Sequence, residues 1–155
     1  NKRVMSEIPT EFNVRIYGLF IHEGSLLVSD ELLQGKPFTK LPGGGLEFGE
    51  SPIECLHREA NEEMGAKITV GKPFYTTDEY IQSYFRPWQQ VICMYFNCQF
   101  QDVASIKVSE QKMDFDYSIT ENQESFRWVN LKDLTAEKFA FLSDQTAINK
   151  LVATF

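Results

Sequence analysis

The 155-residue sequence contains no apolar run long enough to span a membrane, no internal repeat and no low-complexity tract. No signal peptide is visible at its start. Its three cysteines, Cys55, Cys93 and Cys98, are odd in number and lack the spacing of a metal site. These absences argue against a membrane protein and against a disulfide-stabilised secreted protein. We therefore expect a cytoplasmic protein with reduced thiols.

Basic residues are also scarce, with 15 Lys and Arg against 22 Asp and Glu and a net charge of −7. Nucleic acids are bound by clustered Lys and Arg, so this balance argues against a nucleic-acid surface. Small anionic substrates remain compatible with it if a metal neutralises the acids. A hydrophobic fraction of 43% argues against disorder. The length predicts a single domain over residues 1–155.

The strongest local signal is the stretch from residue 41 to residue 66, where a run of glycines precedes a predicted helix over residues 52–64. Ser51, Pro52 and Glu54 have the form of a capping box with proline at the first helical position. Gly65 is a natural residue to follow the last turn.

Three carboxylates share one side of this predicted helix. At about 100° per residue, Glu62 and Glu63 lie within about 60° of Glu59. The neighbouring side is apolar and carries Ile53, Leu56, Ala60 and Met64. Clustered acids near the C-terminal end destabilise a helix, so stability does not explain them. They become favourable around a hard divalent cation such as Mg²⁺, and a solvated acidic face is the alternative.

The spacing of the motif favours the metal. Its glycine, glutamate and arginine positions are Gly44, Glu50, Arg58, Glu59, Glu62, Glu63 and Gly65. In this pattern the stretch resembles the Nudix box, the signature of the Nudix hydrolase family. Ala60 and Ala66 stand where the family usually has a bulkier aliphatic residue, so we expect looser packing behind the helix.

The resemblance implies an α/β Nudix fold, in which a mixed β-sheet is sandwiched between the box helix and a C-terminal helix. It implies a Mg²⁺ site, with Mn²⁺ as an alternative ion. The implied ligands are Glu59, Glu62, Glu63 and a backbone carbonyl of Gly43. Arg58 would orient the glutamates. The general base would be either Glu59 or a glutamate before the last strand, for which the candidates are Glu110, Glu121 and Glu124.

The implied activity is hydrolysis of a diphosphate bond in a nucleoside diphosphate linked to another moiety. A nucleoside triphosphate, ADP-ribose and a nucleotide sugar all fit this description. The alternative is a non-catalytic, nucleotide-sensing Nudix module, which usually has an eroded box, and the intact box here favours the enzyme. The sequence leaves open whether two chains pair as a homodimer.

Two other regions are candidates for substrate binding. Lys40 lies just before the glycines and could contact phosphate, although an exposed lysine at a strand end is the alternative. Residues 80–88 are dense in aromatics, and such residues often line the base-binding face of a Nudix fold. We therefore expect Tyr84, Phe85 and Arg86 to bind substrate, with core packing or a dimer contact as the alternative.

Strand, turn and capping patterns predict the remaining elements, and the most apolar run of the chain, residues 91–100, predicts a central strand. After a loosely held lead-in over residues 1–11, a hairpin joins residues 12–22 to residues 26–28. A polar loop over residues 34–37 leads into a short strand over residues 38–41. Residues 91–100 form a central strand that places Cys93 and Cys98 on opposite faces. A closing strand over residues 126–129 precedes a last helix with Ser143 as N-cap.

Overall fold

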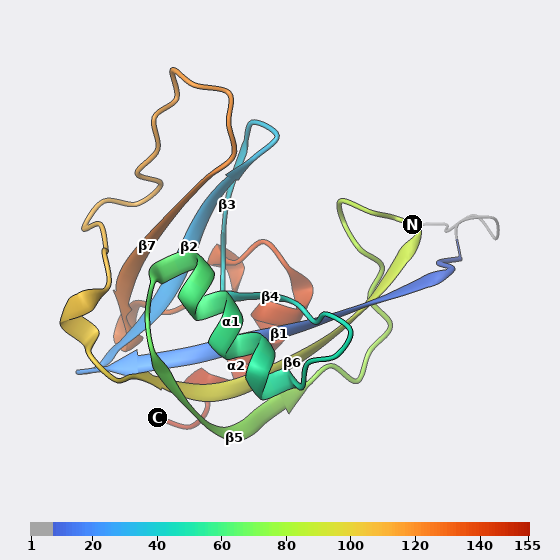
Figure 1. Ribbon diagram of the computed structural model, residues 1–155, viewed down its shortest axis with the longest axis horizontal. Coiled ribbons are helices and arrows are strands. Elements are labelled where there is room, and N and C mark those ends of the chain that lie inside the picture. Colours follow the sequence, from blue (N-terminus) through green and yellow to red (C-terminus); the bar gives the residue numbers. More distant parts are fainter. Residues whose placement is uncertain (1–7) are drawn as a thin grey trace.

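The computed structural model describes residues 8–155, which form seven β-strands and two α-helices (Figure 1). The strands are β1 (Glu11–His22), β2 (Ser25–Leu33), β3 (Lys36–Lys40), β4 (Gly43–Gly45), β5 (Ile68–Thr76), β6 (Gln89–Phe100) and β7 (Gln123–Asn130), and the helices are α1 (Pro52–Met64) and α2 (Leu142–Val152). Of the predicted lead-in, residues 1–7 lie outside the described part of the chain, and residue 11 already belongs to β1.

The strands form one mixed sheet in the order β3-β2-β1-β6-β5, with β4 paired to β1 and β7 paired to β2. β1 and β6 run parallel from the Glu11–Gln89 pair to the Phe20–Cys98 pair, and the other strand pairs are antiparallel. Parallel pairs are normally buried on both faces, which suits the apolar sequences of β1 and β6. The predicted mixed sheet and its central strand are confirmed.

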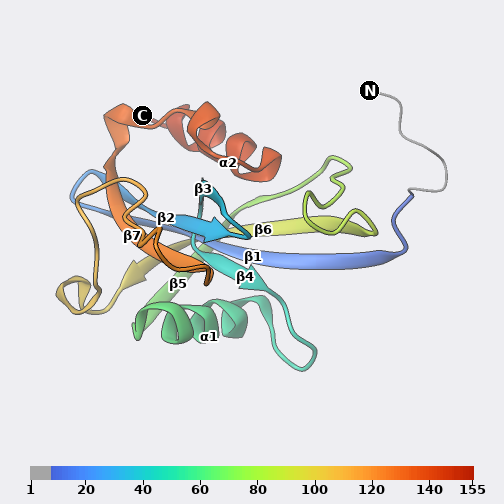
Figure 2. The same ribbon diagram turned by 90° about the horizontal axis from the view of Figure 1, so that it is seen from above.

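The two α-helices cover opposite faces of the sheet, with α1 on one side and α2 on the other (Figure 2). Each helix packs on its own apolar core. The core beneath α1 contains Leu56, Ala60 and Cys98, and the core beneath α2 contains Cys93 and Ile148. The predicted sandwich and the placement of the two strand cysteines on opposite faces are therefore confirmed.

The predicted bounds of α1 are also confirmed. The Ser51 hydroxyl accepts a hydrogen bond from the backbone N–H of Glu54, and the Glu54 carboxylate accepts one from the backbone N–H of Ser51. Gly65 ends the helix in the left-handed conformation, with φ of 61°. On the predicted apolar side of this helix, Leu56 and Ala60 are buried, whereas Ile53 in the first turn is 45% exposed.

Two turn and cap predictions need correction. β2 continues to Leu33 and β3 begins at Lys36, so the predicted loop shrinks to Gln34 and Gly35, whose positive φ angles suit a tight hairpin turn. Ser143 is not the N-cap of the last helix, because α2 begins at Leu142. Instead the buried Asp144 carboxylate ties the first turn to the sheet by accepting hydrogen bonds from the Leu41 backbone N–H and the Tyr95 hydroxyl.

Within residues 8–155, neither helix has the length and apolar composition needed to cross a membrane.

Candidate active site

The glycine run forms the edge strand β4, which pairs with β1 and faces the start of α1. A Cβ atom on Gly44 would lie 1.9 Å from Oε2 of Glu59, so the missing side chain is what lets this carboxylate approach the strand. A Cβ atom on Gly43 would lie 2.1 Å from the backbone oxygen of Ile16, and Gly43 has φ of 144°. Both positions therefore require glycine, for different reasons.

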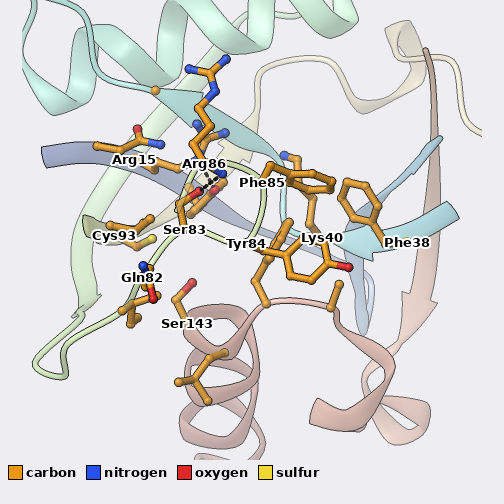
Figure 3. Close-up of a pocket in the computed structure, with 18 of the residues that line it drawn as sticks. Arg15, Phe38, Lys40, Gln82, Ser83, Tyr84, Phe85, Arg86, Cys93 and Ser143 are labelled. Carbon is orange, nitrogen blue, oxygen red and sulfur yellow. Dashed lines mark hydrogen bonds between the residues drawn. The ribbon is translucent and has the colours of Figure 1, made fainter. Parts of the chain in front are cut away.

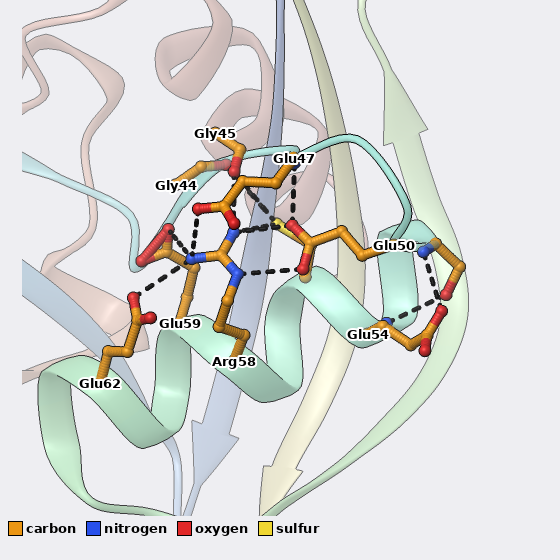
Figure 4. Close-up of polar contacts among 10 residues, drawn as sticks. Gly44, Gly45, Glu47, Glu50, Glu54, Arg58, Glu59 and Glu62 are labelled. Atoms are coloured by element: carbon orange, nitrogen blue, oxygen red, sulfur yellow. Dashed lines mark hydrogen bonds and ion pairs between the residues drawn. The ribbon is translucent and has the colours of Figure 1, made fainter.

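Arg58 is the centre of a group of carboxylates between α1 and the glycine strand (Figure 4). Its guanidinium donates two hydrogen bonds to Glu50, from Nε to Oε2 at 2.9 Å and from Nη2 to Oε1 at 2.7 Å. Nη2 also donates to the Gly45 carbonyl at 2.9 Å. Nη1 lies 3.2 Å from Glu62 and 3.4 Å from Glu59.

These contacts keep Glu50 ionised. The hydrogen bonds from Arg58 lower the pKa of Glu50 to about 2, well below its usual value. Arg58 thus joins the glycine strand to three glutamates of the motif, which is the geometry expected of a residue that orients them. In the structure Glu62, one of the predicted metal ligands, pairs with Arg58 and has a side chain that is 56% exposed.

A second group of carboxylates lies next to Glu59 and has no arginine. Glu63 on α1, Glu124 on β7 and Glu31 on β2 each place one carboxylate oxygen within 4.8 Å of the others. Glu31 and Glu124 are directly opposite each other in the β2–β7 ladder. The Ser29 hydroxyl lies 3.2 Å from one and 3.4 Å from the other.

Three carboxylates at this separation cannot all be ionised without cost. Burial raises the pKa of Glu63, and its hydrogen bond to Glu124 raises it further. Burial also raises the pKa of Glu124. Glu63 and Glu124 therefore share a proton when no cation is bound. Glu59, next to them on α1, also has a raised pKa because of burial, although Arg58 opposes the shift.

Lys40 lies beside this group and is only 5% exposed. Its ammonium is 3.2 Å from Oε2 of Glu31 and donates to the carbonyls of Leu41 and Gly43 at 3.0 and 3.4 Å. Burial alone would lower the pKa of Lys40, but the attraction of Glu31 raises it above its usual value. Lys40 is thus an internal cation of the site rather than an exposed lysine at a strand end.

A buried ion pair fixes the strands that carry Glu31 and Glu124. The Asp30 carboxylate accepts hydrogen bonds from Arg127 on β7 at 2.6 and 3.2 Å and from the Thr39 hydroxyl on β3 at 2.7 Å. It also accepts one from the backbone N–H of Met113 at 3.0 Å. Asp30 is fully buried, so breaking this pair would leave a charge without compensation.

A cavity of about 740 Å³ lies between β1 and the start of α2, and Figure 3 shows Lys40, Phe38 and Arg15 around it. Glu59 and Glu31 also line this cavity. Aromatic rings form one wall: Phe38 lies 5.8 Å from Phe85 and 5.4 Å from Phe141, centroid to centroid. All of the predicted substrate-binding residues line this cavity, namely Lys40, Tyr84, Phe85 and Arg86. The structure therefore brings the aromatic segment and the acidic residues to one cavity.

The donor atoms at the site suit a hard cation. Glu31, Glu59, Glu63 and Glu124 supply carboxylate oxygens, and the glycine strand supplies carbonyls. Mg²⁺ and Mn²⁺ prefer oxygen ligands of this kind. Cys55 lies nearby, with its sulfur 3.6 Å from the Gly45 carbonyl, but burial raises the pKa of its thiol to about 12. It remains protonated and does not offer a thiolate ligand.

Of the three glutamates considered before the last strand, Glu124 alone joins the group around Glu63 in the described part of the chain. Glu110 and Glu121 are exposed in the segment between β6 and β7. Sequence reasoning missed Glu31 and Arg15, both of which line the cavity. The signal available for Arg15 was a charged residue between the apolar residues Val14 and Ile16 of a predicted strand.

Residues 11–150 match the family model described as NUDIX domain. A 72-residue stretch is 36% identical to the pre-mRNA cleavage factor Im 25 kDa subunit 2 of Arabidopsis thaliana, covering 42% of this chain and 36% of that protein. The chain thus spans little more than a third of that relative.

Solved structures with this fold include a NUDIX hydrolase from Nitrosomonas europaea, with a TM-score of 0.68, 17% identity and coverage of 93% of this chain and 90% of the other. A MutT protein from Methanosarcina mazei has a TM-score of 0.67, 18% identity and coverage of 94% and 96%. An ADP-ribose pyrophosphatase from Streptococcus suis has a TM-score of 0.59, 13% identity and coverage of 92% and 90%. At these identities the similarity establishes the fold.

Proposed function

Because the chain belongs to the NUDIX domain family, we propose that it hydrolyses a diphosphate bond in a nucleoside diphosphate linked to another moiety, with Mg²⁺ as its cation. The expected Nudix pyrophosphohydrolase is supported at the level of family and fold. The substrate class and the cation are the parts of the proposal that require experiment.

The observation that carries the proposal is the position of the acidic residues relative to the cavity. Glu59 and Glu31 line the same cavity as the aromatic residues Phe38, Phe85 and Phe141. A substrate whose base or other moiety occupies the aromatic side can therefore place its phosphates beside the carboxylates. The volume of about 740 Å³ is in the range of small-molecule sites.

Glu59, Glu62, Glu63 and the Gly43 carbonyl would hold the cation, with Glu124 beside them. When bound, the cation neutralises phosphate oxygens and lowers the pKa of the attacking water. Mn²⁺ is the expected substitute. The protein's own task is to position these oxygens, and Arg58 does so by bonding both Glu50 and the Gly45 carbonyl.

The general base is either Glu59 or Glu124. Burial raises the pKa of both carboxyls, which makes each a stronger base than a solvated glutamate. Hydrolysis yields a nucleoside monophosphate and the phosphorylated second moiety, or pyrophosphate when the substrate is a nucleoside triphosphate.

The experiment is a panel of nucleotides assayed with Mg²⁺ and with EDTA. The panel contains ADP-ribose, UDP-glucose, dGTP and a dinucleoside polyphosphate. ADP-ribose belongs in it because one structural neighbour is an ADP-ribose pyrophosphatase. We expect nucleoside monophosphate release that requires Mg²⁺ and is lost in Glu63→Gln.

Glu54→Gln is the matched control, because it removes a carboxylate from the same helix while glutamine can still complete the capping box. Tight binding of one nucleotide with no turnover of any would contradict the enzyme and favour a nucleotide-sensing module.

A further inference from the structure

Arg15 is a cation of the cavity that none of the roles described above uses. It lies on β1 between Asn13 and Tyr17, and all three side chains line the cavity. Its two cross-strand neighbours are Gly45 on β4 and Cys93 on β6. Both are small, so the space around the Arg15 side chain stays open to the cavity.

The guanidinium extends over the glycine strand. Nη1 lies 3.6 Å from the position that a Cβ atom on Gly45 would occupy. Nε donates a hydrogen bond of 2.6 Å to the Tyr17 hydroxyl. Tyr17 is 3% exposed and packs against the Tyr95 ring, so it is a rigid acceptor. Arg15 is therefore held in one direction, with its terminal nitrogens towards the cavity.

Arg15 differs from Arg58, Arg127 and Lys40 in having no ion pair with a carboxylate in the described part of the chain. Arg58 is paired with glutamates, Arg127 with Asp30, and Lys40 with Glu31. Among residues 8–155, none of the ion pairs within 4.0 Å involves Arg15, whose Nε donates to the Tyr17 hydroxyl. Arg86, the other arginine that lines the cavity, is exposed and can be solvated by water.

Burial of the Arg15 guanidinium carries a desolvation cost, and Glu59 attracts this guanidinium without forming an ion pair with it. A phosphate would offset that cost, since its oxygens match the planar donors of arginine in a bidentate geometry. A phosphate at Arg15 would also share the cavity with Glu59, where the cation is expected.

We propose that Arg15, oriented by Tyr17, binds a phosphate group of the substrate in the cavity independently of the metal. This inference rests on the proposed function, because that function supplies a substrate with phosphates. Arg15 is then a substrate-binding residue, and Tyr17 is a positioning residue that acts through it. The cation held by the glutamates would bind the diphosphate at one end of the cavity, and Arg15 would bind it separately.

The test is calorimetric binding in EDTA, where turnover cannot interfere. The probes are ADP, GDP, CDP and UDP, each compared with its nucleoside, which lacks phosphate. For the tightest diphosphate, we expect Arg15→Met to weaken binding about 10- to 100-fold, as for other hydrogen bonds to charged groups. Binding of the matching nucleoside should stay unchanged.

Tyr17→Phe keeps the buried ring and removes the acceptor, so it should weaken diphosphate binding by a smaller factor of about 3. This variant serves if Arg15→Met fails to fold. Lys107→Met is the control for loss of one positive charge, because Lys107 is exposed and lies outside the cavity lining. It should bind every probe as the wild type does.

The inference is overturned if the wild type binds no diphosphate in EDTA, if Arg15→Met binds it normally, or if diphosphate and nucleoside weaken together. Steady-state kinetics then separate this inference from the proposed function. If Arg15→Met turns over substrate with an unchanged KM, the proposed hydrolase function stands and the phosphate site at Arg15 is contradicted. If Arg15 binds phosphate but no nucleotide is turned over, the phosphate site stands and the hydrolase function is contradicted.

Discussion

Two groups of carboxylates beside α1 differ in what neutralises them. In the first group, Arg58 pairs with Glu50 and Glu62. In the second group, Glu63 lies beside Glu124 and Glu31 with no arginine. The bonds from Arg58 lower the pKa of Glu50 to about 2 and keep it ionised. In the second, burial raises the pKa of Glu63, which shares a proton with Glu124.

This difference indicates that the first group holds the site in place, whereas the second group is where a cation would bind. Glu50 accepts two hydrogen bonds from Arg58 and has no need of a further cation, whereas carboxylates that share a proton gain from replacing it with Mg²⁺. Glu59 lies between the groups and contacts Arg58 at 3.4 Å. Arg58 thus anchors the helix to the glycine strand, while the group around Glu63 is the part that a cation would complete.

The largest effect is expected from Glu63→Gln. This change removes one cation ligand and the proton that Glu63 shares with Glu124. Because the cation stabilises charge in the transition state by several kcal/mol, we expect turnover to fall about 10²- to 10⁴-fold. The measurement is kcat for Mg²⁺-dependent monophosphate release. Activity within about twofold of wild type, in a folded protein, would mean that this group is not the metal centre.

Arg58→Met tests the other group. Residues that orient metal ligands typically contribute 10- to 100-fold to activity, so we expect turnover to fall by about that factor. Loss of its arginine should also return the pKa of Glu50 from about 2 towards an ordinary value near 4. Carboxyl titration followed by NMR measures this shift directly. An unmoved Glu50 would show that Arg58 is not its partner.

Gly44→Ala tests the approach of Glu59 to the glycine strand. The new Cβ atom would overlap the end of the Glu59 side chain, which can rotate away, so stability should change little. Activity should fall by about tenfold, because the carboxylate leaves its position. Gly43→Ala is the contrasting variant, since its Cβ atom would meet the backbone oxygen of Ile16 and should lower the melting temperature strongly.

The stability of the metal-free protein should depend on pH through Glu63. Because burial raises its pKa in the folded state, the folded protein keeps a proton that the unfolded chain has lost above about pH 5. The free energy of unfolding should therefore decrease as pH rises from 5 towards 8, by at most about 1.4 kcal/mol per unit. Urea unfolding in EDTA measures it, and Glu63→Gln should give a flatter profile.

The smallest effect is expected from Ser51→Ala. It removes the N-cap hydroxyl that accepts from the Glu54 backbone N–H, which should cost about 1 kcal/mol in unfolding free energy. Turnover per folded molecule should be unchanged, because the cap lies at the far end of the helix from Glu63. Chemical denaturation and the nucleotide assay together check both statements.

The elements that sequence predicted best are those whose signals are local. The cap at Ser51, the end at Gly65 and the shared face of Glu59 and Glu63 all lie on one helix, so spacing alone relates them. The alternating pattern also predicted β1, and the apolar run over residues 91–100 predicted β6. Ser143 was assigned wrongly because the helix start depends on Asp144, whose partners Leu41 and Tyr95 are far away in the chain.

The parts of the site that sequence could not predict depend on strand register. Glu31 and Glu124 face each other only because β2 and β7 pair in one register, and Asp30 bonds Arg127 across the same pair. Arg15 is in the cavity because its neighbours across the sheet are Gly45 and Cys93. No short-range pattern encodes these pairings, which involve residues far apart in the chain.

The most direct test of the account is Mn²⁺ binding followed by electron paramagnetic resonance, without any nucleotide. It compares the wild type with the double variant Glu63→Gln, Glu124→Gln and with Glu54→Gln. The account predicts at least tenfold weaker Mn²⁺ binding in the double variant and wild-type binding in Glu54→Gln. A folded double variant that binds Mn²⁺ as tightly as the wild type would contradict it.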